Sequence, residues 1–251
     1  MKYVKIDQEG WKRLLPNGLP FPSSTLISGP GGSGKPLIGF AIVNKWLTSG
    51  GNIIFIPIQY PKTTFLKKSL KRIHNIDIKD YKEQTTFIEF TPELETYEKT
   101  DEHTFKANLL KSQVWQKIFI EAEQSMTPGK ELGTLVFASA LNILLFSPTY
   151  RKECLSYLEQ LLKEDHNRSY LFSASTSAFR EEIRRWENAA ENLLFTRMGE
   201  QMTLYMHVEK LQHKTISSKE TRIPMNKEML KDIKEIAEHT RTRRIPQLKK
   251  I

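Results

Sequence analysis

Short apolar runs alternate with helical patterns along most of the chain. The apolar runs predict strands, and they lie at residues 25–28, 52–58, 86–90, 134–138 and 169–174. Apolar residues at helical spacing predict helices at 37–48, 63–73, 113–124, 150–163, 179–192 and 226–240, with Asn226 as the N-cap of the last. The run at 134–138 has almost no polar residue, which is typical of a central strand. This alternation predicts an α/β domain whose mainly parallel sheet is covered by helices on both faces.

Two regions depart from the alternation. Strand patterns at 193–197, 203–209 and 221–224 follow one another closely, so we expect them to form an antiparallel edge of the sheet. Residues 91–112 are polar and show no clear period. That segment is interpreted as a substrate loop or as a disordered stretch.

The strongest motif lies between the first predicted strand and helix. Gly29-Pro30-Gly31-Gly32-Ser33-Gly34-Lys35 fits the pattern G-x-x-x-x-G-K of a phosphate-binding loop (P-loop). Glycines let backbone N–H groups turn inward around an anion, and the following helix N-terminus adds partial positive charge. The alternative is a glycine-rich turn that binds nothing. The predicted ligand-binding residues are Gly29, Gly31, Gly32, Ser33, Gly34, Lys35 and Pro36.

Pro36 stands where the P-loop pattern has Ser or Thr. Proline fits the first turn of a helix, but it has no hydroxyl for a magnesium ion and no N–H for a phosphate oxygen. The sequence therefore predicts an intact loop with weakened binding of nucleotide and magnesium.

With this loop, the chain resembles the KaiC-like branch of the RecA superfamily, which also includes archaeal RadA-type recombinases. The likeness covers roughly residues 5 to 225, and its most specific part is the lead-in at residues 11–20 (WKRLLPNGLP) before the loop. The resemblance implies a RecA-like P-loop domain over residues 1–240, a basic C-terminal tail over 241–251, ATP or ADP as ligand, and assembly into homo- or hetero-oligomers.

The same resemblance indicates that catalytic positions have been lost. Gln59 and Tyr60 stand where the family has an acidic pair, and Ala138, followed by Ser139, stands where it has a magnesium-binding Asp. The family's Lys-x-Arg element becomes Lys210 with Gln212 in the arginine position. Alanine offers no ligand to magnesium, and glutamine is no base. We therefore assign no catalytic and no metal-binding residue. Asp101, Glu102 or a partner subunit are the alternatives that could restore hydrolysis.

Other candidate residues have two interpretations each. The hydroxyl group of residues Ser173, Ser175, Thr176 and Ser177 could sense a γ-phosphate or cap the next helix, and Asn142 could face the site or cap a turn. We expect Cys154 to be a packed thiol, because it sits in an apolar helical pattern. The six histidines show no zinc-binding spacing.

Charge adds a further partner class. The chain carries a net charge of +9, partly from five cations in the tail and partly from Lys67, Lys68, Lys71 and Arg72 on one predicted helix. These residues could contact nucleic acid or an acidic partner, or could simply be solvated. There is no run of eighteen apolar residues and no apolar signal core, so we expect a cytoplasmic protein with no membrane contact.

Together these features predict a nucleotide-binding protein with lost or very weak hydrolysis and a regulatory or assembly role. Two alternatives stay open: an active ATPase with non-standard ligands, and a DNA-binding protein of the recombination-mediator kind.

Overall fold

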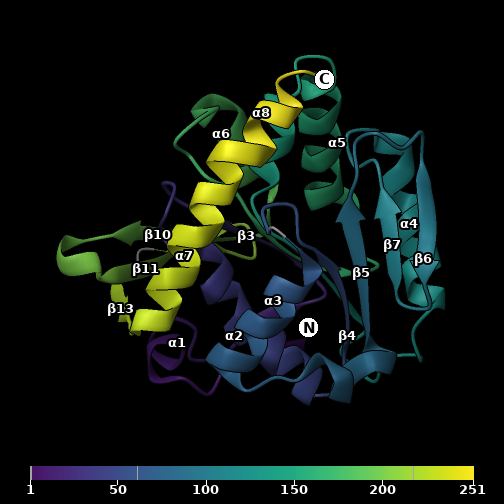
Figure 1. Cartoon of the computed structure of the whole chain (residues 1–251). Helices are drawn as coiled ribbons and strands as arrows, with labels where there is room; N and C mark the ends of the chain where they lie inside the picture. Colours follow the sequence, from purple (N-terminus) through teal and green to yellow (C-terminus); the bar gives the residue numbers. More distant parts are fainter. Residues whose placement is uncertain (1, 61, 217) are drawn as a thin grey trace.

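A computed structural model describes residues 2–60, 62–216 and 218–251 of the chain. Its central feature is an eleven-stranded sheet (Figure 1). In spatial order the strands are β12 (Lys214–Thr215), β11 (Leu204–Leu211), β10 (Asn192–Met198), β3 (Ser24–Ser28), β9 (Ser169–Ser173), β8 (Thr134–Ala138), β4 (Asn52–Ile56), β5 (Thr85–Phe90), β7 (Thr104–Ala107) and β6 (Tyr97–Asp101), with β13 (Thr221–Ile223) also paired to β11. Strands β10 to β7 run parallel, and both edges are antiparallel. A separate antiparallel pair joins β1 (Lys2–Val4) to β2 (Leu19–Phe21).

The helices bury both faces of this sheet. One apolar cluster holds α1 (Glu9–Leu14), α2 (Lys35–Thr48), α3 (Thr63–His74) and α7 (Lys227–His239) against the sheet. The opposite cluster holds α4 (Ser112–Gln124), η2 (Leu141–Phe146), α5 (Arg151–Glu164), α6 (Arg180–Ala189) and α8 (Ile245–Leu248). Neighbouring strand residues separate between the clusters, as Leu26 and Ile27 do, because successive side chains point to opposite faces. Short 3₁₀ segments η1 (Ile78–Gln84) and η3 (Glu200–Met202) complete the chain.

The predicted α/β architecture is confirmed. The mainly parallel sheet and the antiparallel edge formed by β10, β11 and β13 are as expected. Asn226 caps α7, and its side chain accepts a hydrogen bond from the Met229 N–H. Cys154 is buried as predicted, and burial raises the pKa of its thiol to about 12.

The interpretation of residues 91–112 was wrong. The segment forms the antiparallel pair β6–β7 at the edge of the sheet. Four of the five residues of β6 are exposed, so this edge strand buries no face and shows no apolar alternation. The prediction failed because an exposed edge strand lacks the alternation of apolar and polar residues by which strands are recognised.

Residues 241–251, expected as a basic tail, continue the C-terminal helix. After α7 the chain runs through one π-helical turn, η4 (Thr240–Arg244), directly into α8. Leu248 of α8 is fully buried against the cluster around η2, whereas Ile233 and Ile236 of α7 belong to the opposite cluster. The helix therefore crosses from one face of the sheet to the other, as the yellow ribbon in Figure 1 shows.

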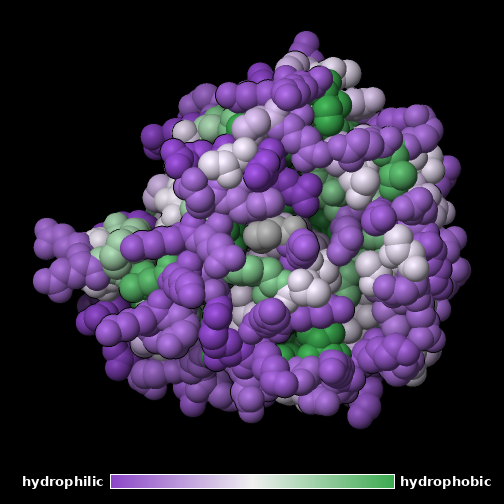
Figure 2. Space-filling view, in the orientation of Figure 1, coloured by the Kyte–Doolittle hydropathy of each residue, from purple (hydrophilic) through white to green (hydrophobic). Residues whose placement is uncertain are grey.

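The surface seen from this side is mostly hydrophilic, with hydrophobic residues in small separate patches (Figure 2). The basic residues of α3 are partly engaged within the fold: Lys67 lies over the Phe87 ring, Lys71 binds Asp77 and Arg72 binds Asp232. Of the helices in the described ranges, none is long and apolar enough to cross a bilayer.

Candidate functional site

A cavity of about 370 Å³ lies where the carboxyl ends of the central parallel strands meet. The P-loop after β3 forms one wall, Gln59 follows β4, Asn142 follows β8, and a serine-rich turn follows β9. The C-terminal helix closes the remaining side with Ile233, Ile236, Ala237, Thr240, Arg241 and Ile245. Carboxyl ends of parallel strands are the usual place for a ligand in an open α/β sheet.

The P-loop has the backbone of an anion-binding nest. Gly29 has φ 141°, and a Cβ there would lie 2.1 Å from the carbonyl oxygen of Thr196, so only glycine fits. Gly32 and Gly34 also have positive φ, and Gly34 is the N-cap of α2. Within the described residues, the N–H groups of Gly32, Ser33 and Gly34 donate to no protein acceptor. These three amides and the N-terminus of α2 are available for an anion.

Lys35 is buried at the bottom of the loop, with only 6% of its surface exposed. Its Nζ donates to the carbonyl oxygens of Gly29 (2.9 Å) and Pro30 (2.6 Å) and to Ser33 Oγ (3.1 Å). Burial lowers the pKa of this amine from 10.5 to about 7. An anion placed beside Nζ would favour the charged form and oppose that shift.

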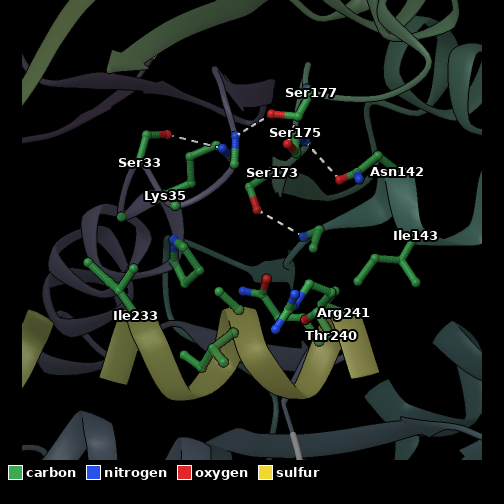
Figure 3. A pocket seen from close by; sticks show the side chains of 18 of the residues that line it. Ser33, Lys35, Asn142, Ile143, Ser173, Ser175, Ser177, Ile233, Thr240 and Arg241 are labelled. Carbon is green, nitrogen blue, oxygen red and sulfur yellow. Dashed lines mark hydrogen bonds between the residues drawn. The ribbon is translucent and has the colours of Figure 1, made fainter. Parts of the chain in front are cut away.

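Hydrogen bonds hold the serine-rich turn against the loop (Figure 3). Ser177 Oγ accepts from the Gly31 N–H at 2.9 Å, and Asn142 Oδ1 accepts from the Ser175 N–H at 2.8 Å. Ser173 Oγ accepts from the Ala140 N–H at 3.0 Å. The N-cap of α6 is Phe179, which makes no side-chain cap bond. Ser173, Ser175, Ser177 and Asn142 therefore line the cavity, whereas Thr176 does not, and Ser177 bonds to the P-loop. Asn142 both faces the cavity and caps the turn at Ser175, but no side chain caps α6, so the helix-capping interpretation of the serines is wrong.

The positions that the resemblance linked to catalysis differ in whether they lie at the cavity. Pro36 and Gln59 line the cavity, and Ala138 lies buried at the end of β8, where Ser139 Oγ has no partner among the described residues. Lys210, in contrast, donates to the carbonyl oxygens of Glu187 and Asn188 at the end of α6 and does not line the cavity.

Asp101 and Glu102, the suggested replacements for the lost acids, do not reach this site. Asp101 ends β6 and Glu102 follows it, near the far edge of the sheet, where Glu102 binds Lys82 at 2.6 Å. Among the residues that the structure describes, those that line the cavity include no Asp or Glu. The described part of the chain also holds no group of three or more His, Cys, Asp or Glu residues suited to a metal ion. A magnesium ion would therefore find no carboxylate ligand in this cavity, although hard cations favour carboxylate oxygens.

The structure places six of the seven proposed ligand-binding residues, Gly31 to Pro36, on the cavity wall. Gly29 is the exception, because it shapes the turn and its carbonyl accepts from Lys35. The contribution of the C-terminal helix was missed. Its amphipathic pattern at 226–240 predicted a helix, but no local signal shows against which part of the sheet that helix packs.

Comparison with known proteins supports the fold. No protein-family model matches the chain, and no curated protein matches its sequence. Among solved structures, the KaiC-like protein PH0186 from the hyperthermophilic archaeon Pyrococcus horikoshii OT3 is similar with a TM-score of 0.64 and 14% sequence identity, over 90% of this chain and 95% of that one. At this identity the likeness concerns the fold alone. The chain has the RecA-like α/β fold of KaiC-like proteins.

Proposed function

We propose that this chain is a nucleotide-binding protein that holds the phosphates of ATP or ADP in its P-loop without hydrolysing them at a significant rate. The observation that carries the proposal is the nest itself. Among the described residues, three successive N–H groups have no protein acceptor, those of Gly32, Ser33 and Gly34, and they stand directly before the buried Lys35 at the start of α2. Backbone donors and a helix N-terminus in this arrangement suit a phosphate group.

The rest of the cavity suits a nucleoside. Its volume of about 370 Å³ is within the range of small-molecule sites, roughly 300–1,000 Å³. Apolar side chains from two elements also line the cavity, Ile143 and Phe146 on η2 and Ile233 and Ile245 on the C-terminal helix. A ligand that combines phosphates with an uncharged ring would suit this mixture of polar loop and apolar side chains.

The described residues that line the cavity do not supply the groups that hydrolysis of a nucleotide requires. A general base must reach the attacking water, and a metal ion normally offsets charge on the transferred phosphoryl group. Gln59 accepts no proton from water, and the described lining of the cavity has no carboxylate for either task. A nucleotide held without turnover fits a regulatory role or a role in assembly.

Calorimetric titration tests the proposal. Wild type should bind ADP and ATP at one site per chain in buffer with EDTA, and added magnesium should not tighten binding. Lys35→Ala should lose most of this affinity. A parallel phosphate-release assay should give equal, near-zero rates for wild type and Lys35→Ala. Absence of nucleotide binding by the folded wild type contradicts the proposed ligand, and release that depends on Lys35 contradicts the lack of hydrolysis.

A further inference from the structure

The phosphates of a nucleotide in this cavity would lack their usual counter-ion, which is magnesium. P-loop proteins normally offset that charge with magnesium held by a Ser or Thr and an Asp. Here those positions are Pro36 and Ala138, and the lining, over the part of the chain that the structure describes, contains no carboxylate. The only cations in the described lining are Lys35 and Arg241.

Arg241 comes from a part of the chain that lies more than 200 residues after the P-loop. It belongs to the π-helical turn η4, and its side chain stands at the rim of the cavity with 76% of its surface exposed (Figure 3). Its Nη2 donates to both carboxylate oxygens of Glu238, at 2.9 and 3.2 Å. An ion pair this exposed contributes little stability, so the guanidinium can exchange Glu238 for a phosphate at small cost.

The helix that carries Arg241 is held firmly from both sides. The buried Asp232 accepts hydrogen bonds from Ser69 Oγ, at 2.7 Å, and from Arg72, both on α3. Beyond η4, Leu248 is buried in the opposite core cluster. These contacts fix the turn over the cavity before any ligand arrives, so contact with Arg241 needs little ordering of the backbone.

Two further polar groups in the same lining lack partners. Thr240 Oγ1 and Gln59 Nε2 are buried, and neither makes a hydrogen bond of normal geometry among the residues that the structure describes, although the Gln59 amide lies beside the Tyr60 hydroxyl. Buried polar groups are normally paired, so such groups call for a ligand or a water. Gln59 is 92% buried and is an N–H donor, which fits a phosphate oxygen or a ligand carbonyl.

Resting on the proposed function, we infer that the C-terminal helix completes the phosphate site within the same chain, with Arg241 supplying the positive charge that magnesium supplies elsewhere. The ligand is then the metal-free nucleoside polyphosphate. Its terminal phosphate lies between the nest at Gly32–Gly34 and the Arg241 guanidinium, within reach of Thr240.

The test compares ADP binding to four proteins by calorimetry, in EDTA and in magnesium. Arg241→Ala should weaken binding in EDTA by about 10- to 100-fold, the range for a hydrogen bond to a charged group. Arg243→Ala, a neighbouring cation that does not line the cavity, should bind like wild type. Glu238→Gln, which removes the competing acid, should bind as tightly as wild type or more tightly.

The effect of magnesium on ADP affinity separates a charge contributed by Arg241 from a merely structural role of this residue. In wild type, magnesium should leave ADP affinity unchanged or lower it, whereas in Arg241→Ala it should restore part of the loss because the cation bound to the phosphates replaces the missing charge. Equal affinity of Arg241→Ala and wild type in EDTA would overturn the inference while leaving the proposed function intact. Failure of wild type to bind ADP would remove both.

Discussion

Above pH 7 the protein should take up a proton when an anion binds in the P-loop. The group that gains this proton, and so makes binding depend on pH, should be Lys35. Burial lowers the pKa of Lys35 to about 7, so in the free protein the amine is mostly neutral at pH 8, where its two N–H groups serve two of the three acceptors around it. A phosphate beside Nζ attracts the protonated form and raises that pKa again. The amine must therefore gain a proton as the ligand binds.

The size of the effect follows from the pKa. With a value of about 7 in the free protein, roughly 0.9 proton should enter per ligand at pH 8. Affinity should fall about eightfold between pH 7.5 and 8.5, because protonation of Lys35 becomes progressively harder. The ligand does not contribute to this change, since the second ionisation of a phosphate group, near pKa 6, is nearly complete at these pH values.

Calorimetry measures both quantities. ADP is titrated into wild type at pH 7.5, 8.0 and 8.5, in pairs of buffers whose ionisation enthalpies differ, and the difference in apparent heat gives the proton uptake. A variant with Lys35→Gln, which keeps a polar side chain but cannot titrate, is the matched control and should show weaker binding with no proton uptake. Unchanged affinity from pH 7.5 to 8.5, together with zero uptake in wild type, would refute the proposed role of the Lys35 charge.

Three further changes test the fold and the site. Lys35→Met removes the cost of burying an amine but leaves the Gly29 and Pro30 carbonyls without their donor, so its effect is measured by the pH dependence of stability in urea unfolding. Because folding lowers the pKa of Lys35, the free energy of unfolding of wild type should rise between pH 7 and pH 10. The Lys35→Met variant should lack this rise, and identical pH profiles for the two proteins would contradict the lowered pKa. Gly29→Ala should destabilise by about 2–4 kcal/mol through its contact with Thr196, while Gly32→Ala, with positive φ but open space, should cost about 1–2 kcal/mol; equal losses in urea would contradict the geometry. Asp232→Ala should raise hydrogen exchange in residues 227–251 and lower stability by about 1–3 kcal/mol, and unaltered exchange there would show that this residue does not anchor the C-terminal helix.

The sequence predicts the sheet core and the loop well because both depend on local patterns. Strands such as β8 are apolar throughout, and the glycines of the loop are required by backbone angles that other residues adopt with strain. Asn226 likewise identifies the start of α7 through a single side-chain hydrogen bond. In each case the residues that determine the local structure are close together in the sequence.

What the sequence does not predict depends on contacts between distant segments. The hairpin β6–β7 has no apolar period because it lies at the edge of the sheet. The position of Arg241 depends on Asp232 meeting α3 and on Leu248 meeting the cluster around η2, more than 100 residues away in sequence. A basic composition looks the same in a solvated tail and in a helix that closes a cavity.

The most direct test of the account is a crystal structure of the chain grown with ADP in the presence of EDTA. We expect the β-phosphate within hydrogen-bond distance of the N–H groups of Gly32, Ser33 and Gly34, with Lys35 Nζ beside it and no metal ion. A nucleotide bound elsewhere on the chain, or a structure from magnesium buffer with the ion held between the phosphates and Ser139, would contradict it.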